Sequence, residues 1–169
     1  DEFVTVVEKG RLNVIYKTDD GIIFEQLPET EAFGGTSYTT EEKDYYGYTL
    51  TEVPENKDGK YVANSTITVE YIYTKNAGKV EDAIVKNGPN KVSSIEETFE
   101  YTLNYSATID EYVGDVTLKL VDTLPYKVSK IIELDKRCSL DATTNQIICT
   151  KTYENINEKN KTINDSFKI

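Results

Sequence analysis

The chain has 169 residues, which suits one ordinary domain or two small ones. Its 30 acidic and 19 basic residues give a net charge of −11, which argues against nucleic acid and anionic membrane surfaces as partners. Histidine is absent, so the commonest general base and zinc ligand are missing and most enzyme classes are disfavoured. No apolar run approaches the ~20 residues that cross a bilayer, so we expect no membrane insertion.

The composition favours β-structure. Thr, Ile, Val and Tyr together contribute 63 residues, whereas Ala contributes 6 and Leu 9. The first four residue types suit a pleated, half-buried surface. We therefore expect a mainly all-β protein.

Alternation of apolar and polar residues predicts strands in the first half of the chain. Residues 12–17 alternate, Asp19-Asp20-Gly21 forms a turn, and the apolar residues 22–24 begin a hairpin partner. Alternation returns over residues 66–73. Between them, residues 39–44 carry the Thr-Glu-Glu pattern of a helix start, which predicts a short helix. This first unit is expected to end near Lys75.

A second strand-rich unit is predicted after the small, polar segment 76–79. Alternation covers residues 99–106 and 116–120, a hairpin is expected over residues 137–150, and a last polar strand over residues 162–169. Residues 1–76 hold 7 basic and 15 acidic groups, a net charge of −8, whereas residues 77–169 hold 12 and 15, a net charge of −3. Neither half repeats the other.

The first half carries an ordered set of short motifs: Gly10-Arg11-Leu12-Asn13-Val14, Asp19-Asp20-Gly21, Gly35-Thr36-Ser37-Tyr38, Gly47-Tyr48-Thr49-Leu50 and Thr68-Val69-Glu70-Tyr71-Ile72-Tyr73. In order and spacing these motifs resemble the MucBP (mucin-binding protein) repeat over roughly residues 8–75. The resemblance implies a β-grasp-like domain over residues 1–75.

The second half carries Phe99-Glu100-Tyr101-Thr102-Leu103-Asn104-Tyr105, Tyr112-Val113-Gly114-Asp115 and Val121-Asp122-Thr123-Leu124-Pro125. These motifs resemble the Ig-like stalk repeats of Gram-positive surface proteins. The resemblance implies an Ig-like β-sandwich over residues 76–169. The closing strand that often contains an Asn is not evident, so this domain is expected to be cut short at its C-terminal end.

Together the two resemblances imply a cell-wall-anchored bacterial adhesin in an extracellular location. Its partners would be the glycans of host mucins or glycoproteins, without an enzymatic activity, a cofactor or a metal, and the fragment is expected to be monomeric. A purely structural stalk that spaces a binding head from the wall is the alternative. An accessory domain of a carbohydrate-active enzyme is disfavoured, because no cleft signature accompanies the many carboxylates.

Two features of the N-terminal half could contact a ligand. Tyr45, Tyr46 and Tyr48 could stack on sugar rings, because a tyrosine offers an apolar face with a polar tip, although tyrosine in a β domain more often serves half-buried sheet packing. The turn carboxylates of Asp19 and Asp20 could hold Ca²⁺, but the Asp-x-Asp-x-Asp-Gly spacing of a calcium loop is missing and an Asp-Asp-Gly turn needs no metal. We therefore predict no metal site.

Cys138 and Cys149 lie on the two strands of the predicted C-terminal hairpin. A turn centred on Thr143-Thr144 places them directly opposite, so that a cross-strand disulfide can form. A five-residue loop over 141–145 shifts them out of register by one and leaves two buried small side chains. Thr-Thr suits a two-residue turn poorly, whereas an outside-facing protein favours oxidation, so both alternatives stand.

The resemblance to stalk repeats also implies an internal isopeptide bond between a first-strand Lys and a last-strand Asn, assisted by a buried acid. This autocatalytic step needs a neutral amine and a protonated acid, and burial favours both. Lys86 shares strand parity with Ile84, and Asp122 shares parity with Leu120, so both can point inward. Asn164 is the only acceptor candidate on the last strand, and the other possibility is an acceptor beyond Ile169, which would leave Lys86 and Asp122 unlinked. The alternative is that Lys86 points outward and Asp122 caps the turn.

Overall fold

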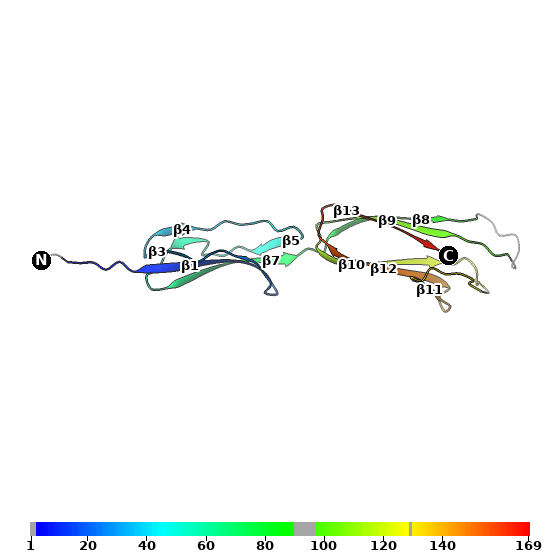
Figure 1. Cartoon of the computed structure of the whole chain (residues 1–169), viewed down its shortest axis with the longest axis horizontal. Coiled ribbons are helices and arrows are strands. Elements are labelled where there is room, and N and C mark those ends of the chain that lie inside the picture. The colour runs from blue at the N-terminus through cyan, green and yellow to red at the C-terminus, as the bar shows by residue number, and fades with distance from the viewer. Residues whose placement is uncertain (1–2, 90–96, 129) are drawn as a thin grey trace. The chain divides into compact units, whose positions relative to one another are not determined.

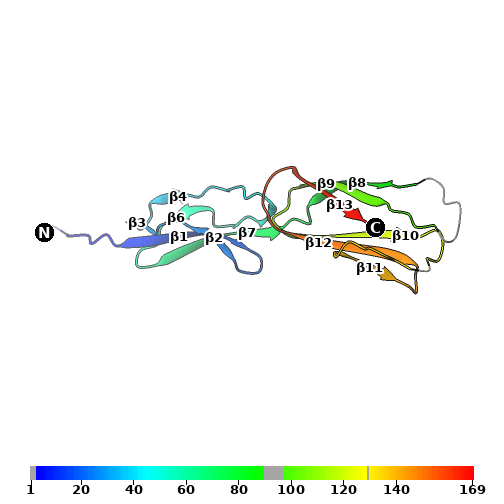
Figure 2. The same ribbon diagram turned by 45° about the vertical axis from the view of Figure 1, so that its right-hand side comes forward.

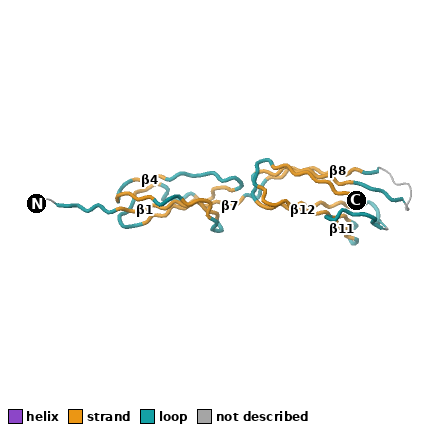
Figure 3. The backbone as a smooth tube through the Cα atoms, viewed as in Figure 1, coloured by secondary structure: helices purple, strands orange, loops and turns teal. Residues whose placement is uncertain are grey.

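The computed structural model describes residues 3–89, 97–128 and 130–169. Throughout these residues the chain forms strands, loops and turns and no helix, which confirms the all-β prediction (Figure 3). The chain divides into two compact units, Asp1–Asn76 and Ala77–Ile169. Figure 1 labels the strands of both units, which are described here one at a time.

Unit 1 is built on a mixed sheet in which the first and last strands lie side by side. The sheet order is β2-β1-β7-β5, β3 also pairs with β1, and β4 and β6 form a separate two-stranded sheet. The strands are β1 (Lys9–Thr18), β2 (Ile23–Gln26), β3 (Thr30–Phe33), β4 (Ser37–Thr39), β5 (Tyr48–Glu52), β6 (Asp58–Lys60) and β7 (Thr66–Lys75).

The parallel pairing of β1 with β7 is the centre of this unit. The pairing runs without interruption from Arg11 opposite Thr66 to Thr18 opposite Tyr73. Its apolar residues alternate with polar ones, so one face of both strands is buried and the other is partly solvated. Parallel first and last strands at the centre of a sheet give the β-grasp-like arrangement that the sequence motifs imply.

The buried face of unit 1 is dominated by tyrosine. The buried side chains are Leu12, Val14, Tyr16, Tyr38, Tyr61, Val69, Tyr71 and Tyr73. The rings of Tyr16 and Tyr71 stack with centroids 5.1 Å apart, and those of Tyr38 and Tyr61 meet edge to face at 5.7 Å. Aromatic contacts of this kind add specific geometry to the burial of apolar area.

The short helix predicted over residues 39–44 is wrong. Thr39 ends β4, and residues 40–47 form an irregular segment that leads into β5 (Figure 3). The hydroxyls of Tyr16 and Tyr73 donate to the backbone carbonyls of Glu41 and Lys43, at 2.7 and 2.6 Å. These bonds from the sheet hold the segment in an extended course and occupy carbonyls that a helix would need for its own ladder.

Unit 2 is a β-sandwich of two three-stranded sheets, with the orders β10-β12-β11 and β13-β9-β8. Figure 2 shows the two sheets as separate layers. Their strands are β8 (Lys79–Asn87), β9 (Thr102–Asp110), β10 (Gly114–Thr123), β11 (Cys138–Asp141), β12 (Gln146–Ile156) and β13 (Lys161–Lys168). The structure therefore has the Ig-like sandwich layout that the second set of motifs implies.

The core of this sandwich lies between the two sheets. Leu103 and Phe167 from one sheet and Leu120, Ile147 and Cys149 from the other have at most 2% of their surface exposed. A second, smaller cluster of Ile109, Ile156 and Ile163 closes the far end of the layer. Both clusters follow the period-two alternation of their strands, which places alternate side chains between the sheets.

The tyrosine hydroxyls of unit 1 predict a specific stability effect. Replacing Tyr73 with Phe removes the bond to the Lys43 carbonyl while keeping the ring, so we expect the free energy of unfolding to fall by about 1 kcal/mol. The matched control is Tyr48→Phe, because the described contacts of Tyr48 are made by its ring. Removing its hydroxyl should therefore change the free energy of unfolding by only a few tenths of a kcal/mol. Urea unfolding of the two variants measures both. Equal stability of the two would contradict the anchoring role of the hydroxyl.

Candidate functional site

The three tyrosines proposed for sugar stacking are all half-buried at the start of β5 and in the loop before it. The ring of Tyr45 stacks on Phe24 of β2 with centroids 4.5 Å apart and meets Tyr73 edge to face at 5.0 Å. Tyr48 contacts the same Phe24 ring edge to face at 4.7 Å. One face of Tyr45 is therefore committed to packing, and the structure groups Tyr45 and Tyr48 around Phe24.

Charged groups surround the same cluster. Lys43 forms an ion pair with Glu25 at 2.7 Å, and the Tyr45 hydroxyl donates to the same Glu25 oxygen at 3.1 Å. The hydrogen bonds from Lys43 and Tyr45 lower the pKa of Glu25, so its carboxylate stays charged. Burial and the neighbouring Glu25 raise the pKa of Tyr45 far above its usual value, so its phenol stays neutral. Together these residues offer aromatic edges, a carboxylate and an ammonium on one side of unit 1.

The Asp19-Asp20-Gly21 turn makes its own hydrogen bonds. Gly21 has a φ of 92°, which suits a residue without a Cβ. The buried Thr18 hydroxyl accepts from the Ile22 amide at 2.8 Å and also bonds to the Asp20 carboxylate. Asp19 accepts from Thr74 at 3.2 Å. These contacts explain both carboxylates as turn residues.

The structure brings together two of the three residues proposed for the isopeptide bond. The Lys86 ammonium lies 2.8 Å from an Asp122 oxygen and 4.2 Å from the centre of the Tyr101 ring. The Tyr101 hydroxyl donates to the same Asp122 oxygen at 2.8 Å. Burial, followed by this hydrogen bond, raises the pKa of Tyr101 well above its usual value. The arrangement is a charge-paired ammonium and carboxylate, with the phenol between the two sheets.

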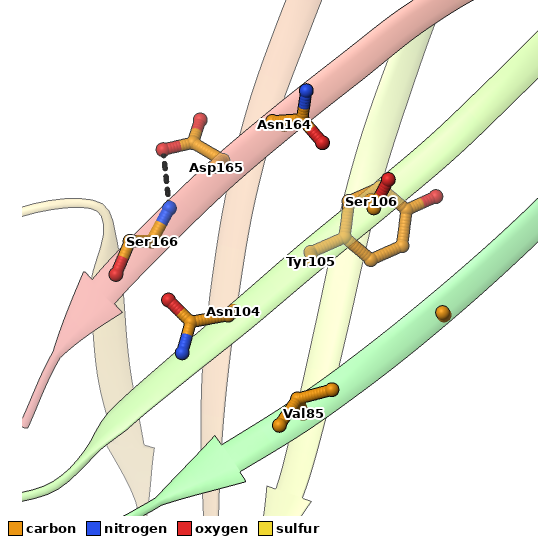
Figure 4. A pocket seen from close by; sticks show the side chains of 8 residues that line it. Val85, Asn104, Tyr105, Ser106, Asn164, Asp165 and Ser166 are labelled. Carbon is orange, nitrogen blue, oxygen red and sulfur yellow. Dashed lines mark hydrogen bonds between the residues drawn. The ribbon is translucent and has the colours of Figure 1, made fainter.

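Asn164 does not join this pair. It lies opposite Ser106 on β9, in the row that continues to Ala83 on β8. Its neighbours Ile163 and Phe167 are buried, so strand alternation places Asn164 on the outer face of the sheet. Figure 4 shows Asn164 there, beside Asn104, Ser106, Ser166 and Val85, around a shallow depression. A bond from Lys86 to Asn164 would have to cross the sheet, so the structure does not bring these two residues together.

A site that the sequence reasoning missed surrounds Asp165. This carboxylate is 10% exposed and accepts from Arg137 at 2.8 Å, from Lys151 at 2.7 Å and from the Tyr153 hydroxyl at 2.8 Å. Arg137 also binds Asp135 at 2.7 Å. The network connects β13 of one sheet to β12 of the other. The parity of Asp165 with Ile163 and Phe167 was the available signal, because it predicts an inward carboxylate that needs partners.

These partners set the charge state of Asp165. Burial alone would raise its pKa, but hydrogen bonds from Lys151, Arg137 and Tyr153 outweigh burial and hold the pKa well below its usual range. The hydrogen bond from Arg137 likewise lowers the pKa of Asp135 to about 2. Burial and the bond to Asp165 raise the pKa of Tyr153 to about 12. The network is therefore a fixed set of charges between the sheets at neutral pH.

The two cysteines lie directly opposite each other in the hairpin of β11 and β12. Cys138 is paired with Cys149 and Asp141 with Gln146, so the loop comprises residues 142–145 and is centred on Thr143-Thr144. Asn145 takes the positive φ, 58°, that this loop requires. The Asp141 carboxylate accepts from the Thr143 amide at 2.9 Å. In this register the structure joins the two sulfurs in a disulfide.

Comparison with known proteins identifies a MucBP domain in the first half of the chain. Residues 11–74 match the MucBP domain, so the N-terminal unit belongs to the MucBP family. The match covers the mixed sheet from β1 to β7 and stops before unit 2.

The chain is also similar to internalin J of Listeria monocytogenes. It is 35% identical over 118 residues to internalin J of serovar 1/2a (strain ATCC BAA-679 / EGD-e), which is 68% of this chain and 13% of that protein. Identity to internalin J of serotype 4b (strain F2365) is 33% over 118 residues, which is 68% of this chain and 12% of that protein. The chain thus spans a small part of these relatives.

Within the described ranges, no helix is long and apolar enough to cross a membrane.

The Asp165 network predicts a pH dependence for unit 2. Because the folded pKa of Asp165 lies below its unfolded value of about 4, its stabilisation is present above that value and is lost as the pH falls through the folded pKa. We expect Asp165→Asn to lower the free energy of unfolding by about 2 kcal/mol at neutral pH, and this difference to shrink below about pH 4. Hydrogen exchange in β12 and β13, measured by mass spectrometry as a function of pH, reports this difference in stability.

The control for this prediction is Glu158→Gln. Glu158 is 65% exposed in its ion pair with Lys161, so its replacement should change stability by a few tenths of a kcal/mol at most. A difference between Asp165→Asn and the unmodified chain that stays constant with pH would show that the carboxylate does not stabilise the fold through its charge.

The cysteine pairing predicts a stability effect confined to unit 2. The bond closes a loop of sequence separation 11, so its reduction should lower the free energy of unfolding of unit 2 by about 3 kcal/mol. Calorimetry with and without reductant measures the change, and the unit 1 transition is the internal control because both cysteines lie in unit 2. Two free thiols in the unreduced, unfolded chain would contradict the pairing.

Proposed function

We propose that the chain is a non-enzymatic, extracellular segment of a cell-wall-anchored adhesin, and that unit 1 binds uncharged glycans of host mucins or glycoproteins. The observation that carries the proposal is the match of residues 11–74 to the MucBP domain. The net charge of −8 on residues 1–76 favours neutral over sialylated or sulfated glycans, because like charges repel.

The contact surface that we propose is the rim of the aromatic cluster around Phe24. Tyr48 is half-buried at this cluster, and the half-buried Tyr46 precedes it by two residues in the chain. A tyrosine ring can lie against the apolar face of a sugar. Glu25 and Lys43 lie next to Tyr45 and can bind sugar hydroxyls. Tyr45 itself supports the rim from behind by stacking on Phe24.

The second candidate function is that of a spacer, and it applies to unit 2. Its sheets are connected by the Asp165 ion network, by the Lys86–Asp122 pair and by an apolar core. Such connections suit a module that must keep its fold outside the cell. In this proposal unit 2 carries unit 1 away from the wall and contributes no glycan contact.

Binding of the whole chain to immobilised mucin tests the first proposal. We expect the double variant Tyr46→Ala/Tyr48→Ala to bind roughly thirtyfold more weakly, because each of the two lost ring contacts is worth about 1 kcal/mol. Tyr126→Ala is the matched control, since Tyr126 is an 81% exposed tyrosine of unit 2 and its loss should leave binding unchanged. Biolayer interferometry gives the affinities, and near-ultraviolet circular dichroism checks that the fold is intact.

Two results would contradict this assignment. Full binding by the folded double variant would remove the tyrosine rim as the contact surface. Failure of the unmodified chain to bind mucin before and after desialylation would leave the spacer function for both units.

A further inference from the structure

Strand β8 is an edge strand of its sheet within the described part of unit 2. It pairs with β9 on one side, and no other strand of the described ranges pairs with it. All nine of its residues are exposed, although the strand contains Val80, Ile84 and Val85 at 57%, 53% and 54% exposure. Figure 4 shows Val85 on β8 beside Asn104 of β9.

Long edge strands offer unpaired backbone groups to another strand, and proteins usually protect them with charged side chains, prolines, bulges or a covering segment. β8 contains no proline, and its pairing with β9 runs from Lys79 to Asn87 without a register shift. Both of its faces carry apolar side chains. Ile84 and Val80 point to the sandwich side, opposite Tyr105 and Ile109, while Val85 points to the outer side.

We propose that β8 is a self-association edge, which pairs antiparallel with the β8 strand of a second copy of this chain, centred on Ile84. A two-fold axis through this residue joins the two three-stranded sheets edge to edge into one continuous sheet. This assignment replaces the monomer expected from the sequence. It is independent of glycan binding, because it concerns unit 2.

The side chains of β8 are complementary to themselves in this register. Ile84 lies opposite the partner's Ile84, and on the same face Asp82 lies opposite the partner's Lys86 on both sides of the axis. On the outer face Ala83 lies opposite the partner's Val85. Directly opposed apolar and opposite-charge pairs are the contacts that stabilise antiparallel strands.

Neighbouring registers lose this complementarity. A pairing centred on Asp82 would place this residue opposite the partner's Asp82. A pairing centred on Ala83 would place Asp82 opposite the partner's Ile84. Centring on Val85 opposes Ile84 to the partner's Lys86. A shift by one residue would set the sandwich side of one copy against the outer side of the other. The charge pattern therefore selects the pairing at Ile84.

Two further properties of unit 2 favour the contact. Lys86 is already held by Asp122 and by the Tyr101 ring, so little side-chain freedom is lost when it meets the partner's Asp82. Residues 77–169 carry a net charge of −3, compared with −8 for residues 1–76, so long-range repulsion opposes association least in this half.

The first test uses charge reversal and mixing, with sedimentation velocity of the whole chain as the readout. We expect the unmodified chain to reach twice its mass of 19.2 kDa as its concentration rises. The Asp82→Lys variant alone should stay monomeric, because pairing would set the new lysine opposite the partner's Lys86. The Lys86→Asp variant alone should also stay monomeric, because pairing would set the new aspartate opposite the partner's Asp82. An equimolar mixture of these two variants should associate again, because every opposed pair then carries opposite charges.

The second test fixes the register. Ile84→Cys should form an intermolecular disulfide rapidly under mild oxidation, because residue 84 meets itself across the axis. The matched control Val80→Cys has similar exposure on the same face, but it lies roughly 27 Å from the partner's residue 80 at about 3.4 Å per residue. It should cross-link far more slowly.

Each contrary result overturns the proposal. A chain that stays monomeric at every concentration has no such edge contact. A dimer that survives Asp82→Lys, or one in which Val80→Cys cross-links as fast as Ile84→Cys, uses a different surface or register. Far-ultraviolet circular dichroism checks that each variant keeps its strands. This check matters most for Lys86→Asp, which replaces the ion pair with Asp122 by two carboxylates.

Discussion

Unit 1 depends on hydrogen bonds between buried tyrosine rings and the backbone of an irregular segment. A β-sheet of this size must cover its apolar face, and most folds of this arrangement use a helix for that purpose. Here Tyr16 and Tyr73 fill the space with their rings and bind the carbonyls of Glu41 and Lys43 with their hydroxyls. One residue type thus supplies the apolar core and satisfies the polar backbone that lies over it. The same bonds position Lys43 and Tyr45 beside Glu25. The segment that covers the sheet therefore also supplies residues of the candidate glycan surface.

Unit 2 connects its two sheets with ion pairs in addition to apolar contacts. Its two sheets bury a moderate apolar core, and Asp165 connects them through Arg137, Lys151 and Tyr153. A small domain has little apolar area to bury, so a satisfied ion network and a disulfide fix its geometry at points where the core is thin. At the other edge the Lys86–Asp122 pair holds β8 over β10. Lys86 thus both connects the two sheets and lies on the edge strand β8.

Alternation predicted most strands of both units, because a half-buried strand must alternate whatever lies around it. The same rule also covers Asn164 and Asp165, because with Ile163 and Phe167 inward, Asn164 has to face outward and Asp165 inward. The helix prediction failed for another reason. The Thr-Glu-Glu pattern describes local preference, whereas the segment is held by Tyr16 and Tyr73, which are distant in sequence. The cysteine register depended on loop length, which Asp141 and Asn145 decide through local geometry that composition does not reveal.

The distribution of charge connects the two proposed contacts. Repulsion between units of net charge −8 keeps neighbouring copies of unit 1 apart and leaves its tyrosine rim open to a neutral ligand. Unit 2 has nearly balanced charge, and its exposed apolar residues on β8 are flanked by Asp82 and Lys86, which admit a partner only where each meets the opposite sign. An edge of hydrophobic residues alone would pair with any strand. The alternation of charge along β8 restricts pairing to one register, and the acidity of unit 1 restricts it to one half of the chain.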